Sequence, residues 1–202
     1  MAQKTNLALR RAGSLSGSQF ALSSLNGASY HLAKITRTLE LAEAAWRADP
    51  DRENRPPLAP KEVNEVLWHL RSFFWELVGV FDLMLQWSNE HFQLGLSEGD
   101  VAWKTVRDAT SSSGHPSWIK VRQVLRDAWD SDWHFDVRTY RNFSHRSFLR
   151  LQMLTSTDPS RRIIVALDAA RENAPMCADI RDEFPKFVEA TRALGARVFL
   201  GT

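Results

Sequence analysis

Cysteine is almost absent from the 202-residue chain, which contains only Cys177. A single thiol excludes an internal disulfide and cysteine-rich zinc sites, and it fits a protein kept in a reducing cytoplasm. We expect Cys177 to be a small buried side chain.

The chain also lacks a large excess of charge of one sign, because its net charge is only +2. The chain lacks the domain-wide basic excess typical of many nucleic-acid-binding domains, so any anion binding must be local.

Long apolar runs are missing as well. The most apolar stretch, in the seventies and eighties, is interrupted by Arg71, Glu76 and Asp82, which argues against a membrane span and a membrane partner. Serine and glycine residues interrupt the region where an export signal would need a continuous apolar segment. We therefore expect residues 1–28 to form a flexible, weakly structured arm. No repeat of about twenty to fifty residues is apparent.

Apolar residues recur instead at three-to-four spacing, which predicts a mainly α protein with a single domain over residues 29–202. After the helices, alternating apolar residues around the turn sequence TDPS predict a small β-hairpin. The expected architecture is a helical bundle with an appended hairpin and a C-terminal helix. The expected helices span about 29–48, 61–90, 98–109, 116–130 and 132–150, the hairpin about 150–168 and the last helix about 178–199.

The expected helix over 61–90 has two faces that need cover. One is a continuous apolar stripe, and the other carries Trp68, Ser72, Trp75 and Gly79 at intervals of four, three and four. The second face could pack inside the domain. Alternatively, it could form a dimer contact in which the two small residues permit close approach between tryptophans.

The chemistry concentrates in one segment, DVRTYRNFSHRSF, at residues 136–148. On a helix, His134, Arg138, Arg141 and His145 form one narrow stripe beside the mostly apolar stripe of Val137, Tyr140, Ser144 and Phe148. Between residues 133 and 162 there are six arginines and two carboxylates. The basic surplus of a nearly neutral chain is therefore concentrated at the margin of its core.

Guanidinium groups bind phosphate oxygens bidentately, and an imidazole can exchange a proton in the same pocket. The segment therefore indicates phosphate binding or phosphodiester chemistry. It lacks a carboxylate pair, so neither a magnesium site nor a cofactor is expected. Asp132, His134 and Asp136 could converge on a metal only if this segment were extended. As a structural alternative, the arginines pair with Glu40, Glu43, Glu62 or Glu65 while His145 is buried.

The sequence VRTYRNFSHR resembles the signature of HEPN domains, in which an arginine, usually followed by a polar residue, precedes a histidine by a few positions. Six residues separate Arg138 from His145. Arg141-Asn142 supplies the typical Arg-Asn pair, but only three residues separate Arg141 from His145. The signature is thus divided between two arginines. The resemblance covers this helix and, more loosely, the helical pattern from about 29 to 150.

This resemblance implies an RNA-binding protein, and specifically a metal-independent endoribonuclease of a toxin-antitoxin or defence type. The implied catalytic residues are His145, Arg141, Arg138 and Asn142, with Arg146, Arg150 and His134 as further contacts to nucleic acid. It also implies a homodimer, and an antitoxin or nucleotidyltransferase as partner. Other members of the family bind RNA or nucleotides without cleaving them, and that alternative remains open for this chain.

Overall fold

The computed structural model describes residues 17–111, 114–145, 149–156, 158, 161–168 and 177–200. Within these residues the chain forms six α-helices, two short 3-10 helices and a two-stranded antiparallel sheet, which confirms a mainly α fold with a hairpin and a C-terminal helix. The α-helices are α2 (Gly17–Ala48), α3 (Pro60–His91), α4 (Trp103–Asp108), α5 (Ser117–Trp129), α6 (Asp132–His145) and α7 (Ile180–Leu200); the 3-10 helices are η1 (Arg52–Asn54) and η2 (Glu98–Asp100); the strands are β1 (Arg150–Leu154) and β2 (Ile164–Asp168).

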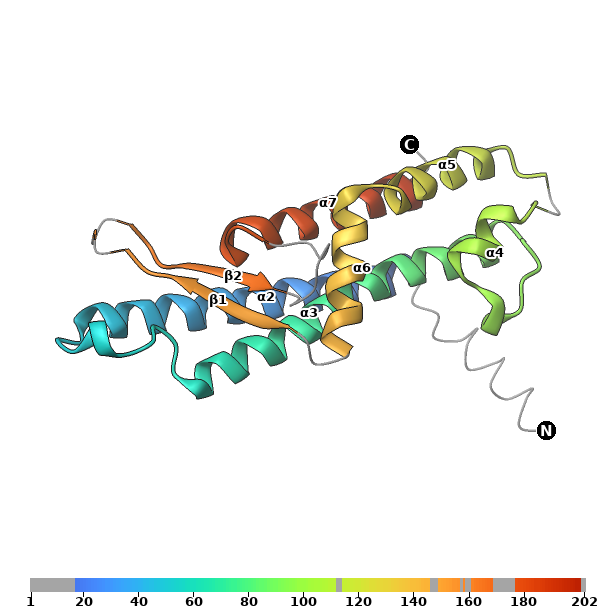
Figure 1. Cartoon of the computed structure of the whole chain (residues 1–202). Coiled ribbons are helices and arrows are strands. Elements are labelled where there is room, and N and C mark those ends of the chain that lie inside the picture. The colour runs from blue at the N-terminus through green and yellow to red at the C-terminus, as the bar shows by residue number, and fades with distance from the viewer. Residues whose placement is uncertain are drawn as a thin grey trace, which may run out of the picture.

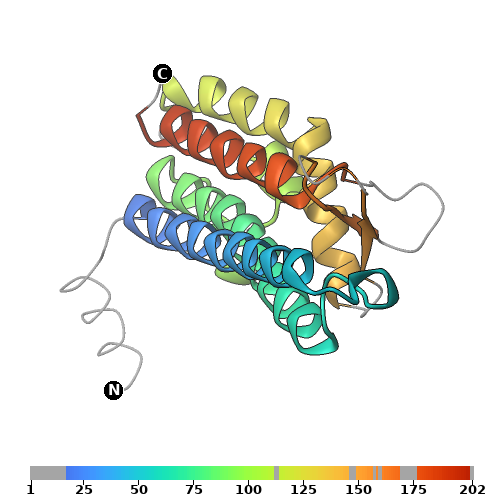
Figure 2. The same cartoon turned by 90° about the vertical axis from the view of Figure 1, so that its left-hand side faces the viewer.

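The helices form two layers (Figures 1 and 2). The long antiparallel helices α2 and α3 make one layer, and α5 and α7 make the other. Helix α6 follows α5 and crosses α3, while the hairpin packs at one end of the α2–α3 layer. The largest buried side chains, including Phe73, Phe74 and Phe184, meet between the layers, where the rings of Phe73 and Phe184 stack at 5.4 Å.

Helix α2 begins at Gly17, so the expected arm over residues 1–28 is too long; its first part, up to residue 16, lies outside the described residues. The serines and glycines that suggested an arm have weak helix propensity. Burial of Ala21, Leu25 and Ala28 outweighs that weakness. A side chain at Gly17 would meet the Trp87 Cβ at 2.9 Å, so the glycine permits close packing of α2 on the end of α3.

Helix α6 confirms the expected helical phase but ends earlier than expected. Val137, Tyr140 and Ser144 are buried, and the Tyr140 ring stacks on Phe74 at 5.1 Å. Phe148 lies outside the described residues. The expected end near residue 150 is wrong, because β1 begins at Arg150.

The hairpin and α7 are attached to α2 through one buried ionic cluster. Arg181, at the start of α7, pairs with Glu43 of α2 at 2.9 Å and with Asp179 at 3.3 Å, and it also donates to the carbonyl oxygen of Ile163. Glu43 accepts a hydrogen bond from the backbone N–H of Ile163 at 2.9 Å. Burial opposes ionisation of Glu43, but hydrogen bonds from Arg181, Ile163 and Arg47 hold its pKa below the usual range.

Cys177 is buried, as expected, and burial raises the pKa of its thiol to about 11. The thiol therefore remains protonated at neutral pH and is a poor nucleophile. Among the described helices, none combines the length and the apolar character needed to cross a membrane.

Candidate functional site

Arg138 of α6 lies against the end of α5. Its guanidinium carbon is 3.7 Å from the centre of the Trp129 ring, and its Nη2 donates to the Trp129 carbonyl oxygen at 3.2 Å. Burial lowers the pKa of this guanidinium, which still keeps its charge at any physiological pH. The face of the Trp129 ring and one carbonyl oxygen hold the guanidinium group, so Arg138 is positioned without a carboxylate partner.

Arg141 lies one turn further along α6 and faces α3. Its guanidinium carbon is 4.4 Å from the centre of the Trp75 ring, and its Nη1 donates to Oδ1 of Asn142 at 3.2 Å. Its Nε is buried and has no hydrogen-bond partner among the described residues. The His145 ring approaches the same Trp75 edge-on at 5.3 Å, so Arg141 and His145 share one aromatic neighbour.

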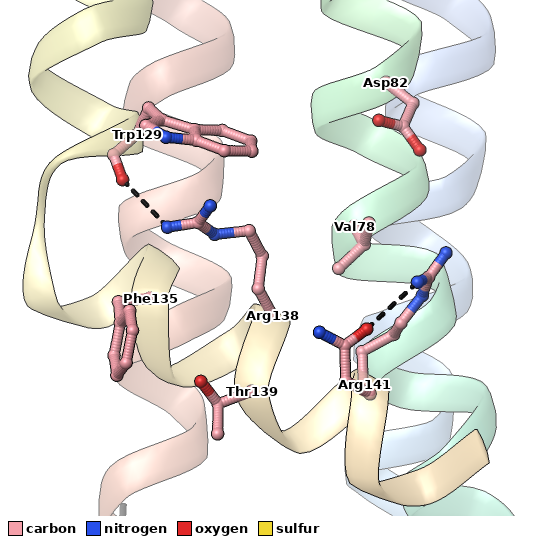
Figure 3. Close-up of a pocket in the computed structure, with 8 residues that line it drawn as sticks. Val78, Asp82, Trp129, Phe135, Arg138, Thr139 and Arg141 are labelled. Carbon is pink, nitrogen blue, oxygen red and sulfur yellow. Dashed lines mark hydrogen bonds between the residues drawn. The ribbon is translucent and has the colours of Figure 1, made fainter. Parts of the chain in front are cut away.

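A cavity of about 390 Å³ opens between α6, the end of α5 and α3 (Figure 3). Its wall includes three of the four expected catalytic residues, Arg138, Arg141 and Asn142. The other lining residues are Val78, Asp82, Trp129, Phe135 and Thr139. His145 is exposed at the end of α6 and is not among the residues that line the cavity. The structure thus gathers the arginines and the asparagine, with the histidine beyond Trp75.

The sequence motif did not identify Asp82 and Trp129, which belong to other helices. Asp82 lies opposite Arg138 across the cavity, on α3. Asp82 is solvent-accessible, but the surrounding protein atoms partly desolvate its carboxyl group and raise its pKa, and the charge of Arg141 opposes that increase. Both residues approach α6 through tertiary packing alone, so no local spacing in the sequence could have predicted them.

The structure excludes the expected ion pairs between these arginines and Glu40, Glu43, Glu62 or Glu65. Among the described residues, no carboxylate lies within ion-pair distance of Arg138 or Arg141. Glu43 is occupied by Arg47 and Arg181, and Glu62 accepts from the backbone N–H of Ala59 at 2.5 Å. His145 is exposed, whereas the alternative required it to be buried.

Two arginines of the remaining basic surplus have partners elsewhere. Arg161 pairs with Asp158, and Arg162 pairs with Asp179 at 3.2 Å and also with Asp182. Arg150 is exposed on β1, where its register partner is Asp168. Arg146 lies outside the described residues. Of the arginines described in this basic region, Arg138 and Arg141 are the two that line the cavity.

His134 is not placed to bind nucleic acid. Its side chain is 2% exposed and packs on the rings of Phe81 at 4.4 Å and Trp129 at 5.4 Å. Burial, together with the nearby charge of Arg138, lowers its pKa to about 3. The imidazole is therefore neutral at physiological pH. This buried position argues against the expected contact of His134 with RNA, although Asp132 and Phe135 of the same turn are exposed.

The second face of α3 is uncovered. Trp68 is 59% exposed and Trp75 is 45% exposed, so these side chains do not belong to the internal core. A Cβ at Gly79 would meet no atom within 4 Å. Much of each tryptophan therefore remains at the surface, although Trp75 contacts Arg141 and His145 and Trp68 contacts His31 and His69.

Comparison of the chain with protein-family models, curated proteins and solved structures gives no match. The resemblance to HEPN domains consequently rests on the residues of α6 alone.

Proposed function

We propose that this protein binds RNA at the cavity beside α6 and cleaves it without a metal ion. The observation that carries the proposal is the pair Arg138 and Arg141, which line one cavity and have no carboxylate partner among the described residues. Phosphate oxygens match the bidentate geometry of guanidinium groups, and RNA presents phosphates along a flexible strand. The resemblance of the motif to HEPN domains supports the same function.

The proposed reaction is an internal transfer at one phosphate. The ribose 2′-oxygen attacks phosphorus and loses its proton while the bond to the 5′-oxygen breaks and that oxygen gains a proton. The products are a 2′,3′-cyclic phosphate and a free 5′-hydroxyl. His145 transfers one of these protons. Arg138 and Arg141 stabilise the charge that builds on the phosphate oxygens. Asn142 orients the guanidinium group of Arg141 by accepting a hydrogen bond at its side-chain oxygen.

Binding without cleavage is the second candidate function. It is favoured by the position of His145, which lies beyond Trp75 and outside the cavity wall. In that case the arginines would hold an RNA strand or a nucleotide and no bond would break. The two candidates share a binding site and differ in the product.

Incubating the protein with single-stranded RNA and a metal chelator tests both candidates. We expect wild type to cleave and His145→Ala to cleave about 10²- to 10⁴-fold more slowly, the usual contribution of an acid-base group. His115→Ala is a matched control, because His115 is also exposed and lies in the loop before α5. Equal rates for His145→Ala and wild type would contradict the catalytic assignment.

Binding is measured separately by titrating RNA at several salt concentrations. Arg141→Gln should weaken binding and reduce the slope of log affinity against log salt by about 0.7, the value for one phosphate contact on a single strand. Salt-dependent binding without any product would establish the second candidate. An unchanged slope would show that Arg141 does not contact a phosphate in either candidate function.

A second copy of this chain is the partner that we propose for the uncovered face of α3. Trp75 belongs to that face and also contacts Arg141 and His145. A copy seated there would border the cavity and could enclose an RNA strand. The family resemblance further suggests a cytoplasmic toxin or defence protein with an antitoxin or nucleotidyltransferase as partner.

A further inference from the structure

The two arginines share their cavity with a carboxylate, which is unexpected in a site for a simple anion. Asp82 lines the same cavity as Arg138 and Arg141. Its carboxylate makes no hydrogen bond or ion pair with the other described residues, and its side chain is exposed. Figure 3 shows it on α3, across the open space from Arg138 and Trp129. The acceptor is therefore available to a ligand.

This arrangement opposes the binding of a bare anion. An ionised carboxylate only accepts hydrogen bonds, and it repels a phosphate drawn in by the guanidinium groups. A ligand that brings a hydrogen-bond donor to Asp82 and an anionic group to the arginines satisfies both sides. A nucleotide has this polarity, because its phosphate lies at one end and its ribose hydroxyls and base N–H groups lie further along.

The size and walls of the cavity fit one nucleotide. Its volume, about 390 Å³, is in the range of small-molecule sites. Phe135 supplies exposed aromatic surface, since its side chain is 54% exposed, whereas the Trp129 ring already carries the Arg138 guanidinium group. Aromatic side chains bind the faces of unpaired bases.

We propose that Asp82 makes this cavity selective for a nucleotide unit, by accepting a hydrogen bond from its ribose or base, over a bare phosphate. The proposal rests on the proposed function, since it concerns the same cavity and the same arginines. It adds a specificity residue that lies outside the α6 motif. The donor comes either from a ribose hydroxyl or from a base edge, and the experiment distinguishes these sources.

The experiment measures the binding of GMP, AMP, CMP, UMP, their 2′-deoxy forms and inorganic phosphate to wild type and to Asp82→Asn. A hydrogen bond to a charged group corresponds to about tenfold in affinity, so wild type should prefer at least one ribonucleotide to phosphate by about that factor. Asp82→Asn should abolish most of this preference and tighten phosphate binding. Glu90→Gln removes an exposed carboxylate from the same helix and should change neither.

The nucleotide series identifies the donor. If it is the ribose 2′-hydroxyl, the deoxy forms lose the preference. If it is a base edge, the deoxy forms keep it and guanine, whose N1–H and N2–H lie side by side, binds best. Circular dichroism verifies that Asp82→Asn is folded.

Two results overturn the proposal in distinguishable ways. If Asp82→Asn shifts nucleotides and phosphate equally, or shifts neither, Asp82 is not selective, whereas the effects of Arg141→Gln and His145→Ala on RNA remain to support the proposed function. If wild type binds none of these ligands and Arg141→Gln does not alter RNA binding, both proposals fail.

Discussion

At the scale of the residue, His134 links the site to the stability of the fold. Its pKa, about 3 in the folded chain, lies well below the usual 6.5 because the ring is buried and Arg138 is nearby. As the pH falls below 6.5, the unfolded chain binds a proton that the folded chain does not, so the free energy of unfolding decreases. The loss approaches about 1.4 kcal/mol per pH unit, the free-energy equivalent of one pKa unit.

His134→Phe should remove this contribution, since phenylalanine is apolar and does not titrate. Urea unfolding between pH 6.5 and 5 should then show a decline that is smaller than in wild type by somewhat under about 2 kcal/mol, the value that the full slope for one group gives over this range. A remainder is expected from His31 and His69, whose pKa values are also lowered by burial. Parallel stability curves for the two proteins would refute this role of His134.

The sequence predicted the residues of the site that lie on one helix. The spacing of Arg138 and Arg141 places them on a single stripe at the edge of the core, and their position on the cavity wall agrees with that. Asp82 and Trp129 were not predicted, because they reach the cavity from α3 and from the end of α5. The burial of His134 was also missed, since a helical stripe does not reveal which of its residues the rings of other helices cover, here those of Phe81 and Trp129.

At the scale of the element, the buried cluster around Arg181 fixes the hairpin and α7 to α2. Removing its charge leaves Glu43 and Asp179 buried with fewer partners, and breaking a buried pair costs about 3–5 kcal/mol. Glu43 keeps Arg47 and Asp179 keeps Arg162, which places Arg181→Met near the lower end of that range. Chemical denaturation measures the loss.

A second pair on α7 supplies the control for this prediction. Arg192 pairs with Glu189 at the surface, where an ion pair contributes at most about 1 kcal/mol. Arg192→Met should therefore change stability little. Equal losses for Arg181→Met and Arg192→Met would show that the buried cluster does not hold these elements together.

The elements themselves were largely predictable, because the apolar period of α3 and the alternation of the hairpin are strong local signals. The expected helix over 98–109 is divided into η2 and the shorter α4, and two longer helices differ from expectation at one end. Helix α2 begins before its expected start, since burial of alanine and leucine against the other helices compensates for a serine- and glycine-rich sequence. Helix α6 stops short of its expected end, where the chain enters β1.

At the scale of the whole molecule, the exposed tryptophans of α3 predict a homodimer. Two large aromatic side chains on one helix face, beside the open surface at Gly79, form an apolar surface that a second copy would cover. Sedimentation velocity at micromolar concentration should detect a dimer for wild type and a monomer for Trp68→Glu. Trp68 is the suitable position, because Trp75 also contacts the site. The control is Ile119→Glu, which changes a similarly exposed apolar residue on α5 and should remain dimeric. A monomeric wild type would rule out a dimer formed through the tryptophan face of α3.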